Sequence, residues 1–92
     1  MIKSFKHKGL RQFFEKGIQS GINTQHVNKL RQRLAVLNEA EDIGEMNLPG
    51  YRLHPLTGDR QGQWAITVSG NWRVTFEFIE GDAYIVNYED YH

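Results

Sequence analysis

The sequence predicts an α+β domain in which helices pack on one face of an antiparallel β-sheet. Two stretches in the first half carry apolar residues at helical spacing, and the last third alternates apolar and polar residues between tight turns. A turn-rich connector separates these two parts. The chain has 92 residues, which suits one domain over residues 1–92.

The chain begins with a short apolar segment, residues 2–5, for which we expect a small N-terminal strand. Residues 7–17 follow with apolar positions three and four apart, and this spacing predicts a first helix of about ten residues. The positions in question are Leu10, Phe13, Phe14 and Gly17. Gly17 is in addition a helix-stop signal.

A second helix is expected after Asn23 or Thr24, because either side chain can cap a helix N-terminus. The helix carries a single apolar stripe made of Val27, Leu30, Leu34 and Leu37. We expect this stripe to pack against the sheet as part of the core. Three basic residues lie off the stripe and are expected to face water or a partner: Lys29, Arg31 and Arg33.

The connector, residues 41–62, is rich in Gly, Pro, Asp and Asn. Within it, Pro55 biases His54 toward an extended conformation. Two tight turns then join three strands into an antiparallel meander. The expected strands are residues 63–68, 72–79 and 83–88.

Alternation along these strands predicts which side chains face the helices. In the middle strand, the covered face is expected to hold Trp72, Val74, Phe76 and Phe78. The uncovered face then holds Arg73, Thr75 and Glu77. In the last strand, one face is expected to hold Tyr84, Val86 and Tyr88.

Composition excludes several classes of protein. The chain has no Cys, which rules out a disulfide framework and a thiolate metal site and fits a reducing compartment. No apolar run approaches the ~18 residues that a membrane span needs, and the N-terminus has no apolar signal segment. We therefore expect a cytoplasmic protein that does not act at a membrane.

The formal net charge of zero hides an asymmetry along the chain. Residues 1–33 hold eight Lys or Arg against one acid, Glu15, whereas residues 34–92 hold three Arg against ten acids. Such polarity allows a basic face to meet phosphates while the rest of the surface stays anionic. The alternative interpretation is that the basic residues only solvate the helices.

A set of polar residues is expected near the uncovered face of the sheet, and it consists of His54, Arg73, Asp90, Tyr91 and His92. These side chains suit metal-free cleavage of RNA. That reaction needs a base for the ribose 2′-OH, an acid for the 5′-oxygen and a cation for the charge that develops on the phosphate. DNA lacks the 2′-OH and cannot react in this way.

Each side chain has a chemical role in this hypothesis. Histidine can do either proton transfer near neutral pH, so His54 and His92 are the candidates for base and acid. Arg73 can donate two N–H groups to phosphate oxygens. Asp90 can orient an imidazole, and Tyr91 can stack on a base or donate a proton. The α-carboxylate at His92 is expected to favour the imidazolium form.

Simpler interpretations remain open from the residues alone. His54 can be an ordinary surface residue, His92 a frayed terminus, and Arg73 an ion-pair partner of Glu77. Two His and an Asp also suggest a metal site, although no helical HxxxH or HExxH spacing supports one. His7 and His26 are expected to be surface residues, and Asn71 is by default a turn former.

Four phrases of the sequence, SFKHKGL, LPGYRLHPL, GNWRVTF and GDAYIVNYEDYH, resemble the HigB toxins, a branch of the RelE-like bacterial toxins. The similarity covers essentially the whole chain. It implies a RelE-like α+β fold and an mRNA interferase, an endoribonuclease that cuts messenger RNA in the ribosomal A site with no metal or cofactor. It also implies inhibition by a HigA-like helix-turn-helix antitoxin, through which the complex binds operator DNA.

The resemblance also implies the active-site residues, which here are His54, Asn71, Arg73, Asp90, Tyr91 and His92. One position departs from the family pattern, because Thr57 stands where a Lys is common. Thr57 can donate a hydrogen bond to RNA but carries no charge, and no spacing indicates that Arg60 reaches the site instead. The alternative is therefore a weakened homologue that acts mainly as antitoxin partner and co-repressor.

The resemblance gives the basic N-terminal third a use. We expect Lys6, Lys8 and Arg11 to dock 16S ribosomal RNA while the uncovered face of the sheet meets the message.

Overall fold

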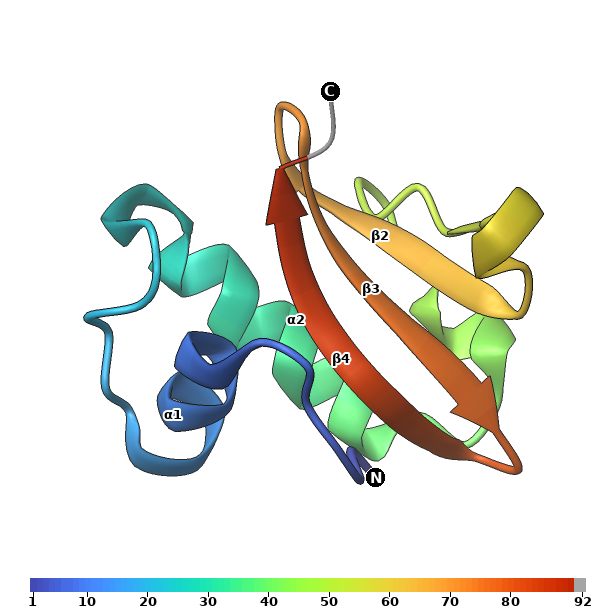
Figure 1. Ribbon diagram of the computed structural model, residues 1–92, viewed down its shortest axis with the longest axis horizontal. Helices are drawn as coiled ribbons and strands as arrows, with labels where there is room; N and C mark the ends of the chain where they lie inside the picture. The colour runs from blue at the N-terminus through green and yellow to red at the C-terminus, as the bar shows by residue number, and fades with distance from the viewer. Residues whose placement is uncertain (91–92) are drawn as a thin grey trace.

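The computed structural model describes residues 1–90 and packs two helices on one face of a four-stranded antiparallel sheet (Figure 1). The helices are α1 (Lys8–Lys16) and α2 (Val27–Glu39). The strands, in their order across the sheet, are β1 (His54–Pro55), β2 (Gln63–Ser69), β3 (Trp72–Ile79) and β4 (Asp82–Asp90). Short 3-10 turns are η1 (Thr24–His26), η2 (Ile43–Met46) and η3 (Gly58–Arg60). The predicted α+β class and the meander are confirmed.

Local sequence signals set the helix ends. The Nδ1 atom of His7 accepts a hydrogen bond from the Leu10 amide at 2.9 Å and caps α1. Gly17 ends that helix at a φ of 73°, a conformation that costs glycine little. The Asn23 side chain accepts from the Gln25 amide at 2.9 Å and caps η1, which runs directly into α2. Both predicted helices are thus confirmed.

The core forms between the apolar stripe of α2 and the inner face of the sheet. Leu30, Leu34 and Leu37 are at most 1% exposed. The sheet contributes Ile66, Val74, Phe76 and Val86, each fully buried. Burying a side chain of this size stabilises the fold by about 1.5–3 kcal/mol, so the contact between α2 and the sheet contributes strongly to stability. None of the helices in residues 1–90 is long and apolar enough to cross a membrane.

The N-terminal segment runs along the free edge of β4 without forming a regular strand. It makes two isolated parallel bridges, Ile2 with Ala83 and Phe5 with Val86. The Asn38 side chain of α2 accepts from the Ile2 amide at 2.9 Å. The expected strand is therefore reduced to a pair of bridges, held between a helix and a strand.

A bulge in β4 makes the predicted alternation of the last strand wrong. Thr75 pairs with Asn87, but Glu77 pairs with Tyr84, so β4 holds one extra residue in this interval. Ile85 takes up the irregularity with a φ of 48°. As a result Tyr84 lies opposite Glu77 on the face away from the helices, whereas the prediction had put it with Val86.

Two further residues are more deeply buried than the sequence suggested. His26 is only 5% exposed, and its Nδ1 lies 2.6 Å from the hydroxyl of Tyr88. Arg33 is 6% exposed, although a place off the apolar stripe had predicted a solvent-facing side chain. Its Nε donates to the Thr67 carbonyl at 2.7 Å, and its guanidinium lies 4.3 Å from the centre of the Tyr51 ring. Arg33 therefore acts as a structural link between α2 and β2.

We predict that Arg33→Ala lowers the free energy of unfolding by about 2 kcal/mol, because the Thr67 carbonyl loses a charged donor and the Tyr51 ring loses its cover. Arg31→Ala, the same change at an exposed position of α2, should change it by no more than about 0.5 kcal/mol. Urea denaturation of both variants measures the difference. Equal effects of the two substitutions would contradict the structural role of Arg33.

Candidate active site

The sheet face that points away from α1 and α2, here called the outer face, carries two of the five expected polar residues, His54 and Arg73. Strand register defines two of its rows. One row holds His54, Ala65, Thr75 and Asn87, and the neighbouring row holds Thr67, Arg73 and Glu89. Adjacent strands are about 4.8 Å apart, so both rows fall within reach of long side chains. His54 and Arg73 are two strands apart and one row apart, on the same face.

His54 lies on the edge strand β1 and is held by its own connector. Its Nδ1 is 2.9 Å from the carbonyl oxygen of Arg52, which can only accept, so Nδ1 carries the proton. Arg52 has a φ of 51°, a left-handed conformation uncommon for residues other than glycine. In a neutral ring the lone pair is then on Nε2, which makes His54 suited to accept a proton.

An ion pair crosses the outer face. Arg60 donates to the two carboxylate oxygens of Glu89, from Nη1 to Oε1 at 2.8 Å and from Nη2 to Oε2 at 2.5 Å. The same Nη2 lies 3.2 Å from the Thr75 hydroxyl and 3.0 Å from the Gln63 amide oxygen. Thr75 in turn donates to Glu89 at 2.5 Å. This cluster ties η3 to β2, β3 and β4.

The cluster also determines the charge state of its carboxylate. Hydrogen bonds from Arg60 hold the pKa of Glu89 below its ordinary value, burial opposes this effect, and the Thr75 hydroxyl adds to it. Glu89 is therefore ionised at neutral pH and stays so to a lower pH than an ordinary Glu, which keeps the guanidinium oriented over the outer face.

Arg73 is held against the β2–β3 turn. Its Nη1 donates to the carbonyl oxygens of Gly70 at 2.7 Å and Trp72 at 3.0 Å. Asn71 is exposed in the same turn, between the two residues whose carbonyl oxygens accept from Arg73. The cross-strand neighbour of Arg73 is Glu89, while Glu77, which the simpler interpretation had paired with it, lies four positions further along β3.

The remaining predicted site residues fall in three places. Thr57 is exposed at the start of η3, three residues before Arg60. Asp90 is the last residue of β4 and pairs with Trp72, one position beyond Glu89 and so on the other side of the strand. Tyr91 and His92 lie outside the described residues.

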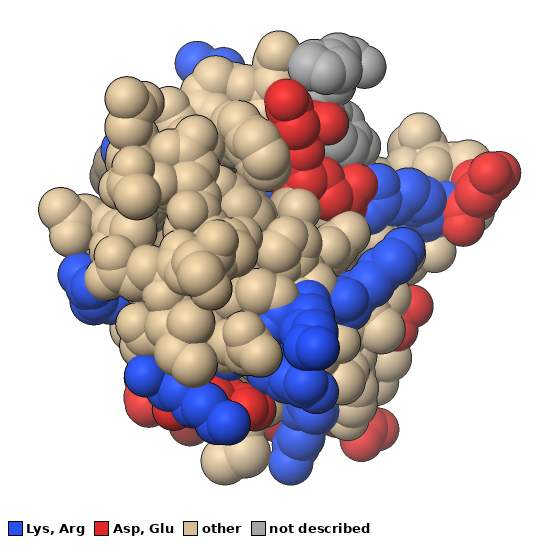
Figure 2. Space-filling model, turned by 60° about the vertical axis from the view of Figure 1, so that its left-hand side comes forward, with Lys and Arg blue, Asp and Glu red and all other residues tan. Residues whose placement is uncertain are grey.

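The predicted RNA-docking residues lie away from the outer face. Lys6 precedes α1, while Lys8 and Arg11 belong to it, and all three are exposed. Figure 2 brings the α1 side forward, and Lys and Arg side chains gather across its lower half. Lys8 and Arg11 of α1 and the outer-face residues His54, Arg60 and Arg73 are therefore on different faces.

Sequence reasoning missed the central pair of the site. The sequence did not indicate Glu89 or Thr75 as site residues, and no spacing in it placed Arg60 at the site. The one available signal was the position of Arg60 three residues after Thr57, which places both in one turn. A cavity of about 470 Å³ adjoins that turn and is lined in part by Thr57, Gln61 and Trp64. Within residues 1–90, no three His, Asp or Glu side chains come close enough together to hold a metal ion.

A helix pair on one face of an antiparallel meander defines a small protein of the RelE-like fold class, here with a His, two Arg and a carboxylate on the other face. A crystal structure of a YafQ mutant from E. coli has the same fold, with a TM-score of 0.68 at 18% identity over 98% of this chain and 91% of that one. At this identity the similarity shows the fold alone.

Sequence comparison gives the family. Residues 3–92 match the family described as the RelE-like toxin of type II toxin–antitoxin system HigB. The chain is 61% identical to Endoribonuclease HigB of Proteus vulgaris over all 92 residues of both. It is 30% identical to Toxin HigB-1 of Vibrio cholerae serotype O1 over 85 residues, 90% of each chain. This chain belongs to the HigB family of RelE-like toxins, as its four sequence phrases had suggested.

We predict that Glu89→Gln lowers the free energy of unfolding at neutral pH by about 1–2 kcal/mol, because a charged hydrogen-bond acceptor is lost. A lowered pKa in the folded state means that the carboxylate stabilises the fold above its ordinary value of 4.5, and that this contribution disappears as the pH falls through the lowered value. The difference in free energy of unfolding between the variant and the unmodified protein should therefore become smaller in acid. Urea denaturation across a pH series measures it.

The control is Glu77→Gln, the same chemical change on the outer face of β3. The account of the Arg60–Glu89 pair would be contradicted if the loss of unfolding free energy in Glu89→Gln stayed constant with pH. A loss of the same size in Glu77→Gln would contradict it as well.

Proposed function

We propose that this protein is the toxin of a type II toxin–antitoxin system that cleaves messenger RNA in the ribosomal A site and so stops translation. Family membership and the 61% identity to Endoribonuclease HigB identify it as a toxin with endoribonuclease activity. The observation that carries the finer proposal is the grouping of one imidazole and two guanidinium groups on the outer face, those of His54, Arg60 and Arg73.

The proposed reaction is an in-line displacement within the RNA. A base takes the proton from a ribose 2′-OH, and the 2′-oxygen attacks the adjacent phosphorus. The bond from phosphorus to the 5′-oxygen breaks, an acid gives that oxygen a proton, and a 2′,3′-cyclic phosphate remains. Two proton transfers and one cationic contact are sufficient, so the mechanism uses no metal and no cofactor.

In this scheme His54 is the base, because the Arg52 carbonyl holds the proton of its neutral ring on Nδ1 and leaves Nε2 to accept. His92 is then the acid.

Arg73 contacts the phosphate oxygens, and Asn71 beside it contacts the nucleotide. Asp90 and Tyr91 orient the acid and the scissile nucleotide. Thr57 supplies a neutral hydrogen bond, and Arg60 supplies a positive charge from the same turn.

The partners follow from the proposed activity. The ribosome presents the message, with Lys6, Lys8 and Arg11 on 16S ribosomal RNA. A HigA-like helix-turn-helix antitoxin restrains the toxin and carries it to operator DNA. The reaction would take place in the cytoplasm, where translation occurs.

Removal of either imidazole is the direct test of the proposed chemistry. We expect His54→Gln and His92→Gln each to lower the cleavage rate by about 10²–10⁴-fold, the usual contribution of a general acid or base. Expression of the unmodified toxin should arrest growth, and neither variant should do so. Primer extension on messages after brief induction should give ends within codons for the unmodified protein only.

Two further variants serve to interpret the growth and cleavage results. His7→Gln changes an imidazole that caps α1 and should keep the toxicity if it folds. If the unmodified protein is produced in folded form and growth continues, the co-repressor alternative gains support, and Thr57→Lys then tests whether the missing charge is the cause. Arrest by both the His54→Gln and the His92→Gln variants would contradict the proposed mechanism.

Charge reversal on the α1 side tests the docking surface. Replacing Lys6, Lys8 and Arg11 together by Glu should lower co-sedimentation with ribosomes at least tenfold in low salt, because three cations near phosphates become repulsive. The unmodified protein should lose binding as salt rises, with a steeper slope than the variant. Unchanged co-sedimentation of a folded variant would mean that the ribosome meets another face.

A further inference from the structure

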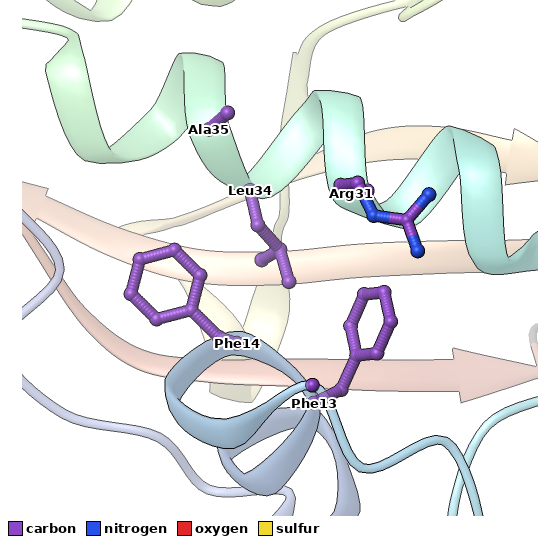
Figure 3. Close-up of a pocket in the computed structure, with 6 residues that line it drawn as sticks. Phe13, Phe14, Arg31, Leu34 and Ala35 are labelled. Atoms are coloured by element: carbon purple, nitrogen blue, oxygen red, sulfur yellow. The ribbon is translucent and has the colours of Figure 1, made fainter.

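The cavity beside η3 lies next to the candidate base, unlike the cavity between the two helices. The latter is lined in part by Phe13 and Leu34, which Figure 3 shows facing each other from α1 and α2. The cavity beside η3 encloses about 470 Å³ and reaches Pro55, the residue after His54. We call it the hairpin pocket. The wall residues on which its chemistry depends are Pro55, Thr57, Gly58, Gln61, Gln63 and Trp64.

The walls of the hairpin pocket are fixed to each other and to the outer face. Pro55 pairs with Trp64 across β1 and β2, and the Leu56 amide donates to the Gln63 carbonyl at 2.8 Å. The side-chain oxygen of Gln63 accepts from Arg60 at 3.0 Å, and Arg60 is itself bound to β4. The pocket therefore keeps one position relative to the polar groups of the outer face.

The lining suits a flat, uncharged ring with polar edges. Trp64 contributes a half-buried indole, and none of the described lining residues carries a charge. A phosphate would therefore find no ion-pair partner in the pocket. Gln61 is exposed, and its amide can both donate and accept. The Gln63 oxygen is occupied by Arg60, so its amide nitrogen is the group left to donate. Aromatic rings and polar side chains bind unstacked RNA bases in this way.

A nucleotide can reach the pocket from the outer face. Strand alternation sets His54 and Pro55 on opposite sides of β1, but β1 is the edge strand and only two residues long. The far wall is open, because among the described residues no atom lies within 4 Å of the place that a Cβ would take at Gly58 or Gly62. A ribose beside His54 can therefore direct its base around the edge and into the pocket.

We propose that the hairpin pocket binds the nucleobase on the 5′ side of the cleaved bond. In the proposed reaction His54 takes the proton from the 2′-OH of that same nucleotide, and Pro55 at the pocket is the next residue of the chain. The base stacks on Trp64, and its polar edge pairs with Gln61. Trp64 and Gln61 thus determine which nucleotide is accepted before the cut. This inference rests on the proposed function in taking His54 as the base.

The first test measures cleavage by the full-length toxin on ribosomes. Four messages carry A, C, G or U before the cut, and a fifth is abasic there. The unmodified toxin should cleave the abasic message about tenfold more slowly than the best of the four, because stacking on an aromatic ring is lost. Gln61→Ala should reduce the difference in rate among the four bases. It should cause no further loss on the abasic message.

Trp64 also packs against the core, so its variant is Trp64→Phe, which keeps a smaller aromatic ring. This variant should slow cleavage of the four base-bearing messages by about threefold and leave the rate on the abasic message unchanged. The matched control is Gln19→Ala, which removes an exposed amide outside the pocket and should leave all five rates unchanged. An equal loss on all five messages in Gln61→Ala would indicate a structural role and overturn the proposal.

A binding measurement separates this proposal from the proposed function. The probe is a trinucleotide in which hydrogen replaces the 2′-OH at the cut, so that it cannot be cleaved. In nuclear magnetic resonance spectra of the full-length toxin, titration should shift the Trp64 indole N–H and the Gln61 amide. The same probe made abasic before the cut should shift neither signal.

The outcomes are distinct. Base-dependent shifts in a toxin that cleaves no message would contradict the proposed function and support the pocket. Cleavage without any effect of the base, or the absence of shifts at Trp64 and Gln61, would overturn the pocket. Reduced ribosome co-sedimentation of Gln61→Ala with unchanged discrimination among the four messages would assign the pocket to ribosomal RNA and overturn the proposal as well.

Discussion

The ion pair between Arg60 and Glu89 connects the two parts of the chain from which the candidate site is built. Arg60 ends η3 in the connector, which also supplies His54 and Thr57, while Glu89 lies near the end of β4. The two charges meet over the buried Thr75, whose hydroxyl donates to the same carboxylate. Breaking such a pair by removing one partner leaves a charge without its counter-ion in a half-buried place, which costs more than the pair itself contributes. The position of the connector over the outer face therefore depends on this contact.

Much of the fold could be predicted because its signals are local. The apolar stripe of α2, the Gly17 stop and the turns between strands each depend on residues within one helical turn or one hairpin. The errors occur where tertiary packing overrides local pattern. The bulge at Ile85 shifts the alternation of β4, since the fit of β4 on β3 takes precedence over strict alternation. Arg33 is buried because the Thr67 carbonyl and the Tyr51 ring offer a polar acceptor and a flat cover, neither of which a helical wheel can show.

The candidate site also contains residues that local sequence patterns predict and residues that only long-range contacts bring in. His54 and Arg73 were identified from residue type, proline context and strand alternation, and the register does set them on one sheet face. Arg60 and Glu89 are 29 positions apart, and their contact depends on how η3 folds back over three strands. No periodicity in the sequence carries that information. Thr75 was assigned to the correct face, but its burial beneath a guanidinium requires the same long-range arrangement.

Thr57 stands where a Lys is common in the family pattern, and Arg60 lies in the same turn. A lysine at position 57 would place a mobile ammonium on a long stem, and binding a phosphate would cost it conformational entropy. Arg60, from the same turn, holds its charge on a planar group that two carboxylate oxygens and Gln63 already orient. Pre-oriented charge stabilises a developing phosphate charge without reorganisation at the moment of reaction. Glu89 balances that charge in a bidentate pair, and because its pKa is lowered, the carboxylate stays ionised at neutral pH and keeps the guanidinium in one direction. The outer face thus holds an ordered guanidinium close to Thr57, with its charge paired to Glu89.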